Sequence, residues 1–476
     1  MYIVFPTFEV APIQNGGIGQ YILSTIKTLQ ETNYVPLVIL YNSPYDRIVE
    51  IREYFQSSNL FSEIFHINDF SEVQLNTEDI YDQTKTALAM KQCLASIISQ
   101  KQVAGIEWCD HAGVGYQVLI DKQLNPQSVF KEVSMWVHIH GSREIWELTD
   151  RYPADVYSGN PAYILSNYNE RICLELADAW KCPSKSVADW YADYYGIQNK
   201  NFISALPYRK LDSHLSYLQR NHDIPKCPIK ILVPGRIQYI KGNDIVARAC
   251  VNLCSKFPNQ FHVTFAGYSN PSANSEYNSS LDEVKSFIPK EFLSHFSFLN
   301  KFSAEKYLKL AKESHLAVFA SRVETFCLAA HEINWLGLPL VLSDIPAFKD
   351  HFQHKINCYK FNDVESLTNL LSEIISDPEV LNNINSQPVS DFNVNIFQEL
   401  INLPFSPKAN SNYLLFTKFQ EIYLNQIQSG NLGFKELSTY SLKLLIKASV
   451  WKFAKKLADK ISASPDLRIF VKKMLK

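Results

Sequence analysis

The segment Leu316–Ser343, LAVFASRVETFCLAAHEINWLGLPLVLS, contains a predicted strand, helix and second strand in direct succession. One apolar run ends near Ser321, a helical pattern follows, and Gly337 and Pro339 end that pattern before the next apolar run. Strands that are continuous apolar runs, each followed by a helix, are typical of parallel sheets covered by helices on both faces. This segment therefore predicts an α/β fold with parallel strands.

The same alternation recurs along the chain and divides it into two domains. The apolar runs YIVFP and VPLVIL near the N-terminus, and IKILVPGRI, FHVTFAG and HFSFLN further on, are separated by segments with helical spacing. A polar stretch, Leu218–Pro228, lies between the two groups and predicts a linker. We therefore expect one α/β domain at 1–215 and a second at 227–405.

The composition is that of an ordinary globular protein. Of the 476 residues, 46% are hydrophobic and 20% are charged, and the net charge of −2 gives no reason to expect nucleic acid as a partner. Nine scattered cysteines without C-x-x-C pairs indicate reduced thiols in a cytosolic protein. The start, MYIVFPTFEVAP, does not resemble a signal peptide, and no run of about 18 apolar residues predicts a transmembrane helix.

Two carboxylates, Glu324 and Glu332, stand in the mostly apolar segment Leu316–Ser343. Glu324 falls in the turn at the carboxyl end of a predicted strand, where open α/β sheets bind ligands, and Glu332 falls inside the next helix. The helix start between them offers N–H groups and a positive dipole end to an anion. A favourable dipole interaction alone would explain Glu324, but it leaves Glu332 among Ala, Ile and Trp unexplained.

A basic pair follows the first predicted strand of the second domain, in VPGRIQYIKGND. Arg236 and Lys241 combine a planar guanidinium with a compact ammonium, which suits a diphosphate. A solvated basic loop is the alternative, because isolated pairs with this spacing are frequent by chance. The phosphate loop G-x4-G-K-[ST] does not occur in the chain.

Glycines and histidines follow predicted strands of the first domain. In QNGGIGQY, Gly16 and Gly17 would let the backbone approach a phosphate at a helix start, although a plain turn is the alternative. In WVHIHGS, His138 and His140 share one face of a strand. The sequence names no third ligand for a metal, so a histidine in the core is the alternative. His140 stands nearer to the strand end and to the expected cleft.

Together these features resemble the retaining nucleotide-sugar glycosyltransferases of the GT-B fold, specifically glycosyltransferase family 4. The family's E-x7-E motif appears here as Glu324, TFCLAAH and Glu332. The resemblance extends over residues 1–425 and is strongest at 230–347. It implies two Rossmann-like domains that face a central cleft, with the donor held mainly by the second.

The resemblance also implies a role for each matching residue. The predicted catalytic residues are Arg236 and Lys241 on the diphosphate, Glu324 on the transferred sugar, and His140 beside that sugar. The other predicted contacts with the donor are Glu332 on the ribose hydroxyls, Gly16 and Gly17 near the phosphate, and the helix start formed by Phe326, Cys327 and Leu328. The family usually has glycine where Cys327 stands, which is the main departure from its pattern.

The implied chemistry needs neither a metal nor a cofactor. Breaking a sugar–phosphate bond places negative charge on the leaving diphosphate, and preorganised cations can stabilise it. The chain contains no D-x-D motif of the metal-dependent kind, so no metal site is expected. Retention of configuration would proceed without an obvious protein nucleophile, and the leaving phosphate would accept the proton of the acceptor.

Two alternatives to a transferase stay open at this point. A nucleotide-sugar epimerase shares the architecture, but it lacks the paired glutamates in this setting. A non-catalytic nucleotide-sugar or glycan-binding module is the alternative from another class. The intact set of Arg236, Lys241, Glu324 and Glu332 disfavours it, whereas Cys327 leaves it open.

The C-terminal part carries two further predictions. The segment 411–427 matches the helix with which the family crosses back to its first domain. Residues 434–476 hold 11 Lys/Arg and 3 Asp/Glu, a net charge of +8, with apolar side chains at helical spacing. Such a basic amphipathic helix suits an anionic membrane surface, or else packs on the protein with a solvated lysine face.

We expect a cytoplasmic protein, peripheral to the inner face of the membrane if the tail binds it. Its expected acceptor is a glycan, a lipid-linked or another hydroxyl group, in cell-surface polysaccharide or glycolipid synthesis.

Overall fold

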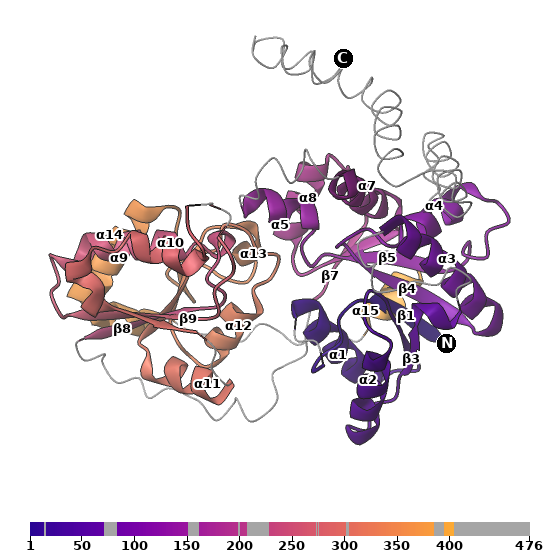
Figure 1. Ribbon diagram of the computed structural model, residues 1–476, viewed down its shortest axis with the longest axis horizontal. Helices are drawn as coiled ribbons and strands as arrows, with labels where there is room; N and C mark the ends of the chain where they lie inside the picture. The colour runs from indigo at the N-terminus through magenta and orange to yellow at the C-terminus, as the bar shows by residue number, and fades with distance from the viewer. Residues whose placement is uncertain are drawn as a thin grey trace, which may run out of the picture.

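The computed structural model describes residues 1–13, 16–70, 83–150, 161–198, 200–206, 228–272, 274, 276–300, 304–384 and 395–403. Within them the chain forms two α/β lobes, each built on one parallel sheet (Figure 1). The predicted pair of parallel-sheet domains is confirmed. The crossover helix expected at 411–427 and the basic tail expected at 434–476 lie outside the described residues.

The first sheet has seven parallel strands among the described residues, in the order β3-β2-β1-β4-β5-β6-β7. Its strands are β1 (Tyr2–Thr7), β2 (Val35–Leu40), β3 (Glu63–His66), β4 (Val103–Cys109), β5 (Ser134–His138), β6 (Ala179–Cys182) and β7 (Phe202–Ser204). Its helices are α1 (Gly17–Leu29), α2 (Asp46–Ser57), α3 (Gln83–Gln100), α4 (Tyr116–Leu124), α5 (Arg143–Thr149), α7 (Pro161–Leu176) and α8 (Lys185–Tyr195), with the short 3-10 turn η1 (Ile67–Asp69).

The second sheet has six parallel strands among the described residues, in the order β10-β9-β8-β11-β12-β13. Its strands are β8 (Ile229–Pro234), β9 (Phe261–Ala266), β10 (Phe296–Leu299), β11 (Leu316–Phe319), β12 (Leu340–Ser343) and β13 (Tyr359–Phe361). The helices and 3-10 turns around it are η3 (Tyr239–Lys241), α9 (Asn243–Cys254), α10 (Ser280–Ser286), η4 (Lys290–His295), α11 (Ala304–Glu313), α12 (Leu328–Trp335), α13 (Pro346–Lys349), α14 (Val364–Ser376) and η5 (Pro378–Asn383).

Apolar runs form the central strands because both faces of each sheet are buried. Val4 on β1 pairs with Leu37 on one side and Ile106 on the other, and all three are fully buried. In each sheet the first strand in the chain lies in the middle. The next two strands are added in turn on one side of it, and all later strands lie on its other side. The two resulting switch points lie between β1 and β4 and between β8 and β11, and open α/β sheets bind ligands at such points.

The chain returns to the first lobe before it leaves the described residues. The short helix α15 (Ile396–Ile401) packs Phe397 against Phe5 and Trp136, with ring centroids 6.5 and 6.3 Å apart. Ser134 Oγ also donates a hydrogen bond to the carbonyl oxygen of Ile401 at 2.8 Å. The domain boundary expected at 405 therefore differs from the packing, because residues 396–401 already belong to the core of the first lobe.

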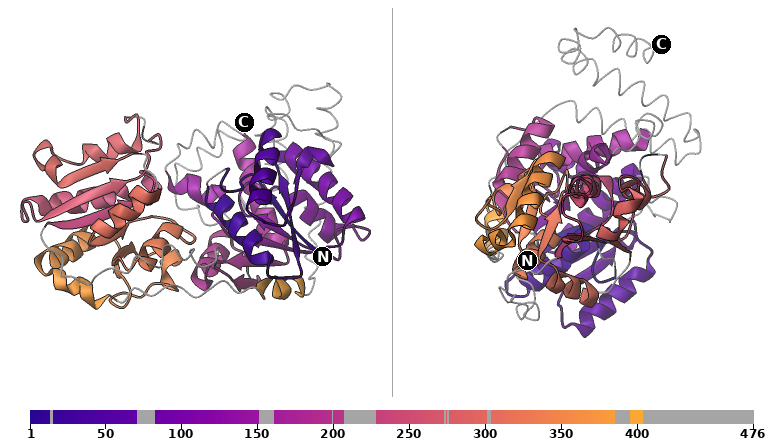
Figure 2. Two further views of the ribbon diagram at one scale, coloured as in Figure 1. Left: turned by 90° about the horizontal axis from the view of Figure 1, so that it is seen from below. Right: turned by 90° about the vertical axis from the view of Figure 1, so that its left-hand side faces the viewer.

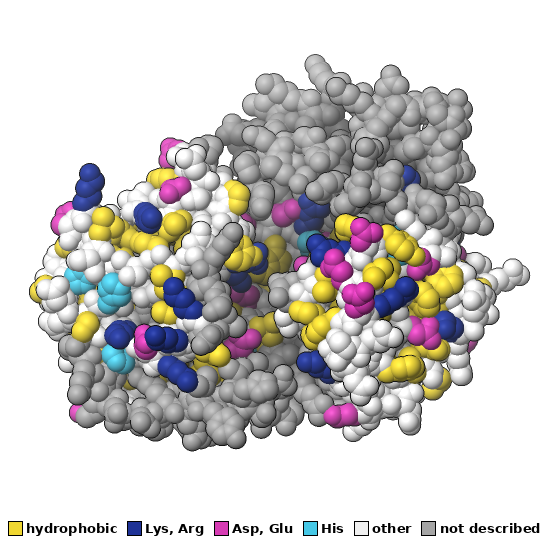
Figure 3. All heavy atoms as spheres, turned by 60° about the horizontal axis from the view of Figure 1, so that its bottom comes forward, with side chains coloured by type: hydrophobic (Ala, Val, Ile, Leu, Met, Phe, Trp, Pro, Cys, Tyr) yellow, Lys and Arg dark blue, Asp and Glu magenta, His cyan; other side chains and the backbone are white. Residues whose placement is uncertain are grey.

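The two lobes lie side by side (Figure 2, left), and the space-filling view shows a furrow between them (Figure 3). Charged side chains of both signs lie on either side of this furrow in the space-filling view (Figure 3). Away from the predicted donor loops, Asp350 after α13 accepts hydrogen bonds from the backbone N–H and hydroxyl of Ser186 on α8, at 2.8 and 2.6 Å. In the described residues, no helix is both long and apolar enough to span a membrane.

Candidate functional site

The switch point of the second sheet carries three predicted residues in two neighbouring loops. The loop after β8 holds Arg236 and Lys241, and the loop after β11 holds Glu324. Lys241 Nζ lies 2.5 Å from Glu324 Oε1, which also accepts a hydrogen bond from Ser321 Oγ at 2.9 Å. Glu324 is 6% exposed, whereas the Lys241 side chain is 20% exposed. The fold thus joins two predicted site residues into one partly accessible ion pair.

The Lys241 turn can lie against the end of β11 only because Gly242 follows it. Gly242 has a φ of 66°, and a Cβ atom there would lie 1.9 Å from the carbonyl oxygen of Ala320. A side chain at this position would be strained and would also push the turn away from the strand end. Gly242 therefore places Lys241 close to the loop that carries Glu324.

Arg322 holds the same turn in place, although no sequence pattern indicated it. Its backbone N–H donates to the carbonyl oxygen of Ile240 at 2.8 Å. Its guanidinium donates to both carboxylate oxygens of Asp244 at 2.8 Å, and lies 3.6 Å from the ring centroid of Tyr239. A planar guanidinium that donates two parallel hydrogen bonds to one carboxylate fixes the orientation as well as the distance of that carboxylate. Arg322 thus links the two loops on which Lys241 and Glu324 stand.

Helix α12 begins beside the ion pair, at a residue with unusual backbone geometry. Cys327 is the residue before the helix and has φ 63° and ψ 72°, in the left-handed region. This conformation explains why glycine suits the position and why a β-carbon is costly there. Burial and the neighbouring Glu324 raise the pKa of the Cys327 thiol well above its ordinary value, so it stays protonated. Phe326 stacks on His331 with ring centroids 3.9 Å apart, which anchors the helix start.

The backbone at Cys327 gives a test by substitution. We expect Cys327→Val to lower the free energy of unfolding by about 1–2 kcal/mol, because a β-branched residue is poorly accommodated at positive φ. Cys327→Gly should change it by less than about 1 kcal/mol, since relief of strain offsets the entropy that glycine loses on folding. Urea unfolding curves measure both values. Leu328→Val, one residue into α12, is the control, and equal losses for both valine variants would contradict the explanation.

Glu332 lies inside α12 and is half-buried. Burial raises the pKa of this carboxyl group to about 7. It also lies near Tyr307 of α11, whose phenol pKa is raised by burial and by the charge of Glu332. A carboxylate kept partly out of water is a strong acceptor for hydroxyl groups that a ligand brings to it.

The raised pKa predicts a pH dependence of stability and of ligand binding. Folding disfavours the charged form of Glu332. The contribution of its protonated form to the free energy of unfolding is therefore fully present below about pH 4.5, and it is lost as the pH rises through about 7. A ligand whose hydroxyl groups donate hydrogen bonds to the Glu332 carboxylate favours its ionised form. The affinity of such a ligand should therefore rise as the pH rises over the same range. Calorimetric titration with a nucleoside at pH 6, 7 and 8 would measure this slope. Glu332→Gln should flatten it, and an identical slope in the variant would assign the effect to another group.

The glycine loop of the first lobe encloses a carboxylate that sequence reasoning missed. Glu9 Oε2 accepts a hydrogen bond from the backbone N–H of Gly19 at 3.1 Å, and a Cβ atom on Gly16 would lie 2.0 Å from the same oxygen. Gly16 is therefore needed to admit the Glu9 side chain, whereas a Cβ on Gly17 would meet nothing within 4 Å. Burial raises the pKa of Glu9, and the hydrogen bond from Gly19 and, to a smaller extent, the charge of Arg236 from the second lobe oppose that rise. The Glu9 carboxylate beside the glycine loop is thus close enough to Arg236 to sense its charge.

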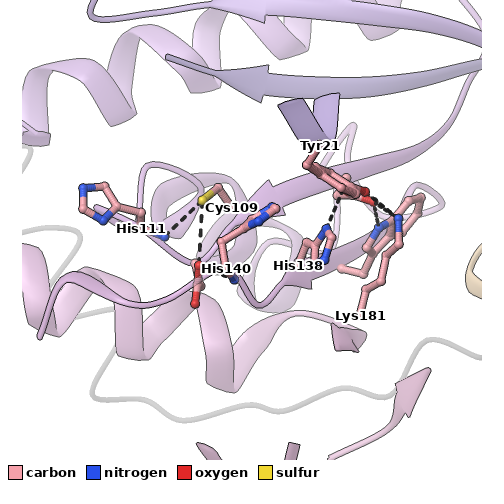
Figure 4. Close-up of polar contacts among 9 residues, drawn as sticks. Tyr21, Cys109, His111, His138, His140 and Lys181 are labelled. Atoms are coloured by element: carbon pink, nitrogen blue, oxygen red, sulfur yellow. Dashed lines mark hydrogen bonds and ion pairs between the residues drawn. The ribbon is translucent and has the colours of Figure 1, made fainter. Parts of the chain in front are cut away.

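His140 follows the end of β5 by two residues and lies next to a contact between the lobes. Its ring lies 4.0 Å from the ring centroid of His138 and 4.8 Å from that of Tyr21 (Figure 4). Burial, with His138 nearby, lowers the pKa of His140 well below its ordinary value, so its imidazole is neutral. Its backbone N–H donates to Asp110 at 3.0 Å, and its carbonyl oxygen accepts a hydrogen bond from Thr325 of the second lobe at 2.9 Å.

A buried polar network packs against the ring of His140 through Tyr21 and His138. Lys181 on β6, which is fully buried, donates to Tyr21 at 2.5 Å and lies 3.1 Å from Glu107 Oε2 (Figure 4). Trp136 Nε1 donates to the same carboxylate oxygen at 2.6 Å, and His138 lies 3.4 Å from the other one. Burial alone would raise the pKa of Glu107, but Lys181 and His138 hold it below its ordinary value. His138 is therefore a residue of the core, as the alternative reading of the sequence proposed.

Comparison with known proteins shows which family the second lobe resembles. Residues 218–387, which include both predicted donor loops and α12, match a family model. That model describes the glycosyl transferases of group 1. The match covers the second lobe of the chain, and together with the fold it supports the group 1 family. No curated protein matches the chain in sequence.

Solved structures with similar folds include two enzymes and one sugar-nucleotide complex. Sucrose-phosphate synthase from Thermosynechococcus elongatus has a TM-score of 0.58 at 14% identity, over 90% of this chain and 99% of its own. Anabaena Alr3699/HepE in complex with UDP-glucose has a TM-score of 0.52 at 15% identity, over 84% and 98%. The catalytic domain of Starch Synthase IV from Arabidopsis thaliana, bound to ADP and acarbose, has a TM-score of 0.52 at 11% identity, over 84% and 98%. These similarities confirm the predicted fold of two Rossmann-like domains, as in the GT-B group 1 glycosyl transferases.

Proposed function

We propose that the chain is a retaining glycosyltransferase that moves a sugar from a nucleotide-diphosphate sugar to a hydroxyl group of an acceptor. The observation that carries this proposal is the Lys241–Glu324 pair at the β8/β11 switch point, beside the start of α12. A cation and a carboxylate at that edge suit a ligand with a diphosphate next to sugar hydroxyls. The match to group 1 glycosyl transferases over 218–387 supports the same reaction class.

In the proposed mechanism, binding of the donor releases Lys241 from Glu324. Lys241 and Arg236 then hold the diphosphate, and the carboxylate of Glu324 accepts hydrogen bonds from hydroxyls of the transferred sugar. The bond between the sugar's anomeric carbon and the phosphate oxygen breaks, and the two cations stabilise the charge that develops on the leaving phosphate. The acceptor oxygen bonds to the anomeric carbon on the same face, and its proton passes to the leaving phosphate.

The other predicted residues keep their roles within this proposal. Glu332 binds the ribose hydroxyls, and the backbone of Phe326, Cys327 and Leu328 lies along the phosphate. Gly17 offers an open approach from the first lobe, and the neutral imidazole of His140 lies on the first-lobe side of the sugar. No metal and no further cofactor takes part, because Arg236 and Lys241 supply the positive charge.

The acceptor is proposed to be a glycan or a lipid-linked hydroxyl group, as used in cell-surface polysaccharide or glycolipid synthesis. The segment 434–476, with its net charge of +8, would bring the enzyme to the cytoplasmic face of an anionic membrane. Sedimentation with vesicles that contain an anionic phospholipid tests this part. The full chain should sediment and a chain ending at residue 433 should not, whereas equal sedimentation of both would rule out the tail.

A nucleotide-binding panel tests the donor site directly. UDP, GDP, ADP and dTDP are added to the wild type, and thermal stability is measured for each. A nucleotide at about 100 times its dissociation constant should stabilise the protein by about 2.7 kcal/mol. The best nucleotide's sugar conjugates are then incubated without acceptor and with glycan acceptors, in buffer with EDTA, and the anomeric configuration of the product is read by NMR. Binding without hydrolysis or transfer would favour a binding module, and conversion of the donor into an epimer would favour an epimerase.

A further inference from the structure

One segment of the first lobe contacts both donor loops of the second lobe. The segment runs from the end of β5 through α5, from His140 to Asp150. At its start, the carbonyl oxygen of His140 accepts the hydrogen bond from Thr325, which directly follows Glu324. At its end, Asp150 accepts hydrogen bonds from the loop that leads to Lys241. The two loops that form the proposed donor site are therefore both bonded to the opposite lobe.

The contact made by Asp150 is buried and bidentate. Asp150 Oδ2 accepts from Gln238 Nε2 at 2.5 Å, and Oδ1 accepts from the backbone N–H of Ile240 at 2.9 Å. Asp150 is 6% exposed and Gln238 is 9% exposed. Hydrogen bonds that a buried carboxylate accepts from N–H donors are short and strong, because little water competes for them. They fix the two residues on either side of Tyr239, immediately before Lys241.

The same helix also meets Lys241 itself. The ammonium group of Lys241 lies over the ring of Trp146 on α5, 5.0 Å from its centroid. Trp146 in turn packs so closely on Gly141 that a Cβ atom there would lie 1.9 Å from its Nε1. The Lys241 side chain is thus bounded by Glu324 from its own lobe and by Trp146 from the other.

Helix α5 moves with the first lobe because its N-terminal end is firmly held there. The carboxylate of Glu170 on α7 accepts from the backbone N–H groups of Arg143 and Glu144, at 3.0 and 3.4 Å. Ser142 accepts a hydrogen bond from Tyr195 at 2.6 Å, and its N–H donates to Tyr191 at 2.9 Å. The distance between the lobes therefore decides whether Asp150 reaches the Lys241 turn.

We propose that Asp150 is a positioning residue that fixes the Gln238–Lys241 turn from the opposite lobe, so that the donor site is complete only when the lobes are closed. It acts through Gln238 and Ile240 and does not touch the substrate. Arg322 holds the same turn from within the second lobe, so the turn is correctly placed only when both supports are present. The kinetic part of this inference rests on the proposed glycosyl transfer, whereas the closure part does not.

Two substitutions separate positioning from charge. Asp150→Ala removes both hydrogen bonds and should lower kcat/KM for transfer by about 10- to 100-fold, as expected for a misplaced catalytic group. Asp150→Asn should stay within about threefold of the wild type. Its Oδ1 can accept from Ile240, and the Gln238 amide can flip so that its oxygen accepts from the asparagine N–H₂. Equal losses in the two variants would overturn the inference, because they would show that the charge itself acts.

Asp350→Ala is the matched control, since Asp350 also accepts two hydrogen bonds across the interface but contacts neither donor loop. Its kcat/KM should stay within about threefold of the wild type, because an exposed contact competes with water. A loss equal to that of Asp150→Ala would assign the effect to the interface in general and overturn the inference. Thermal denaturation of each variant identifies any loss that comes from unfolding.

Small-angle X-ray scattering of the ligand-free full-length proteins tests closure without any reaction. We expect a larger radius of gyration for Asp150→Ala than for the wild type, Asp150→Asn and Asp350→Ala. An unchanged radius for Asp150→Ala would overturn the inference, as would a wild-type kcat/KM. If even the wild type transfers no sugar, the proposed function fails, and the scattering alone then decides whether Asp150 holds the lobes together.

Discussion

Lys241→Met is expected to lower kcat/KM for sugar transfer by about 1,000-fold, the scale of losing one preorganised group that stabilises developing charge. The ammonium group of Lys241 can move with a leaving phosphate, because it stands at the end of a flexible side chain. That side chain is partly exposed, and its ammonium group pairs with Glu324. Steady-state rates with the best donor measure the change. Binding of the nucleotide diphosphate alone should weaken less than the rate, since the interaction strengthens in the transition state.

The loss must be separated from a loss of folding. Lys241→Met leaves Glu324 buried without its cation, which by itself can destabilise the loop. The double variant Lys241→Met/Glu324→Gln removes both charges and should regain stability without regaining activity. Lys230→Met, at an exposed position on β8, is the matched control and should behave as the wild type. Substantial activity in the double variant would contradict the role of Lys241 on the diphosphate.

Lys181→Met is expected to lower the free energy of unfolding by about 3–5 kcal/mol, the usual cost of removing one partner of a buried ion pair. Lys181 is fully buried, and its removal leaves the carboxylate of Glu107 in the core with its charge uncompensated. The ring of Phe397 from α15 also lies 4.6 Å from the Lys181 ammonium, so docking of α15 should weaken too. Urea unfolding followed by tryptophan fluorescence reports the loss, because Trp136 and Trp180 lie in this core.

A double variant shows whether the charge or the packing is responsible. Lys181→Met/Glu107→Gln removes both charges while keeping similar volumes, and it should recover most of the lost stability. Lys185→Met removes an exposed lysine whose pair with Asp189 lies on the surface, and it should change the free energy of unfolding by less than about 1 kcal/mol. Equal destabilisation by the single and double variants would show that the methylene packing of Lys181, and not its charge, holds the network together.

The departures from the expected pattern have physical explanations in the loops. Cys327 occupies a left-handed position that suits glycine, so this chain keeps the helix start at some cost in backbone strain. Gly16 was expected to admit a phosphate, and the structure shows that it admits the carboxylate of Glu9. Both observations concern backbone geometry and close approach, which single residue types in a sequence indicate only loosely.

The sequence by itself determined the two parallel-sheet lobes, and its motifs led to the residues proposed for the second-lobe site. Continuous apolar strands such as Leu316–Phe319 are dictated by burial on both faces, and that pattern is local in the chain. Glu324 stood out as a carboxylate in an apolar segment, whereas Lys241 was assigned to the proposed site through the combined motifs and the family resemblance. Their direct pairing was not foreseen, although both were assigned to one ligand.

Only the tertiary structure revealed the supports around this site. Asp150 meets Gln238 and Ile240 across 88 and 90 positions, and these contacts depend on how the two lobes approach each other. The return of α15 to the first lobe likewise depends on the packing of Phe397 against Phe5 and Trp136. Periodicity records which face of a helix or strand is buried, but it does not record which distant partner covers that face. The residues of the proposed site could therefore be nominated from their types and spacing, whereas the contacts that support them followed only from the packing of the lobes.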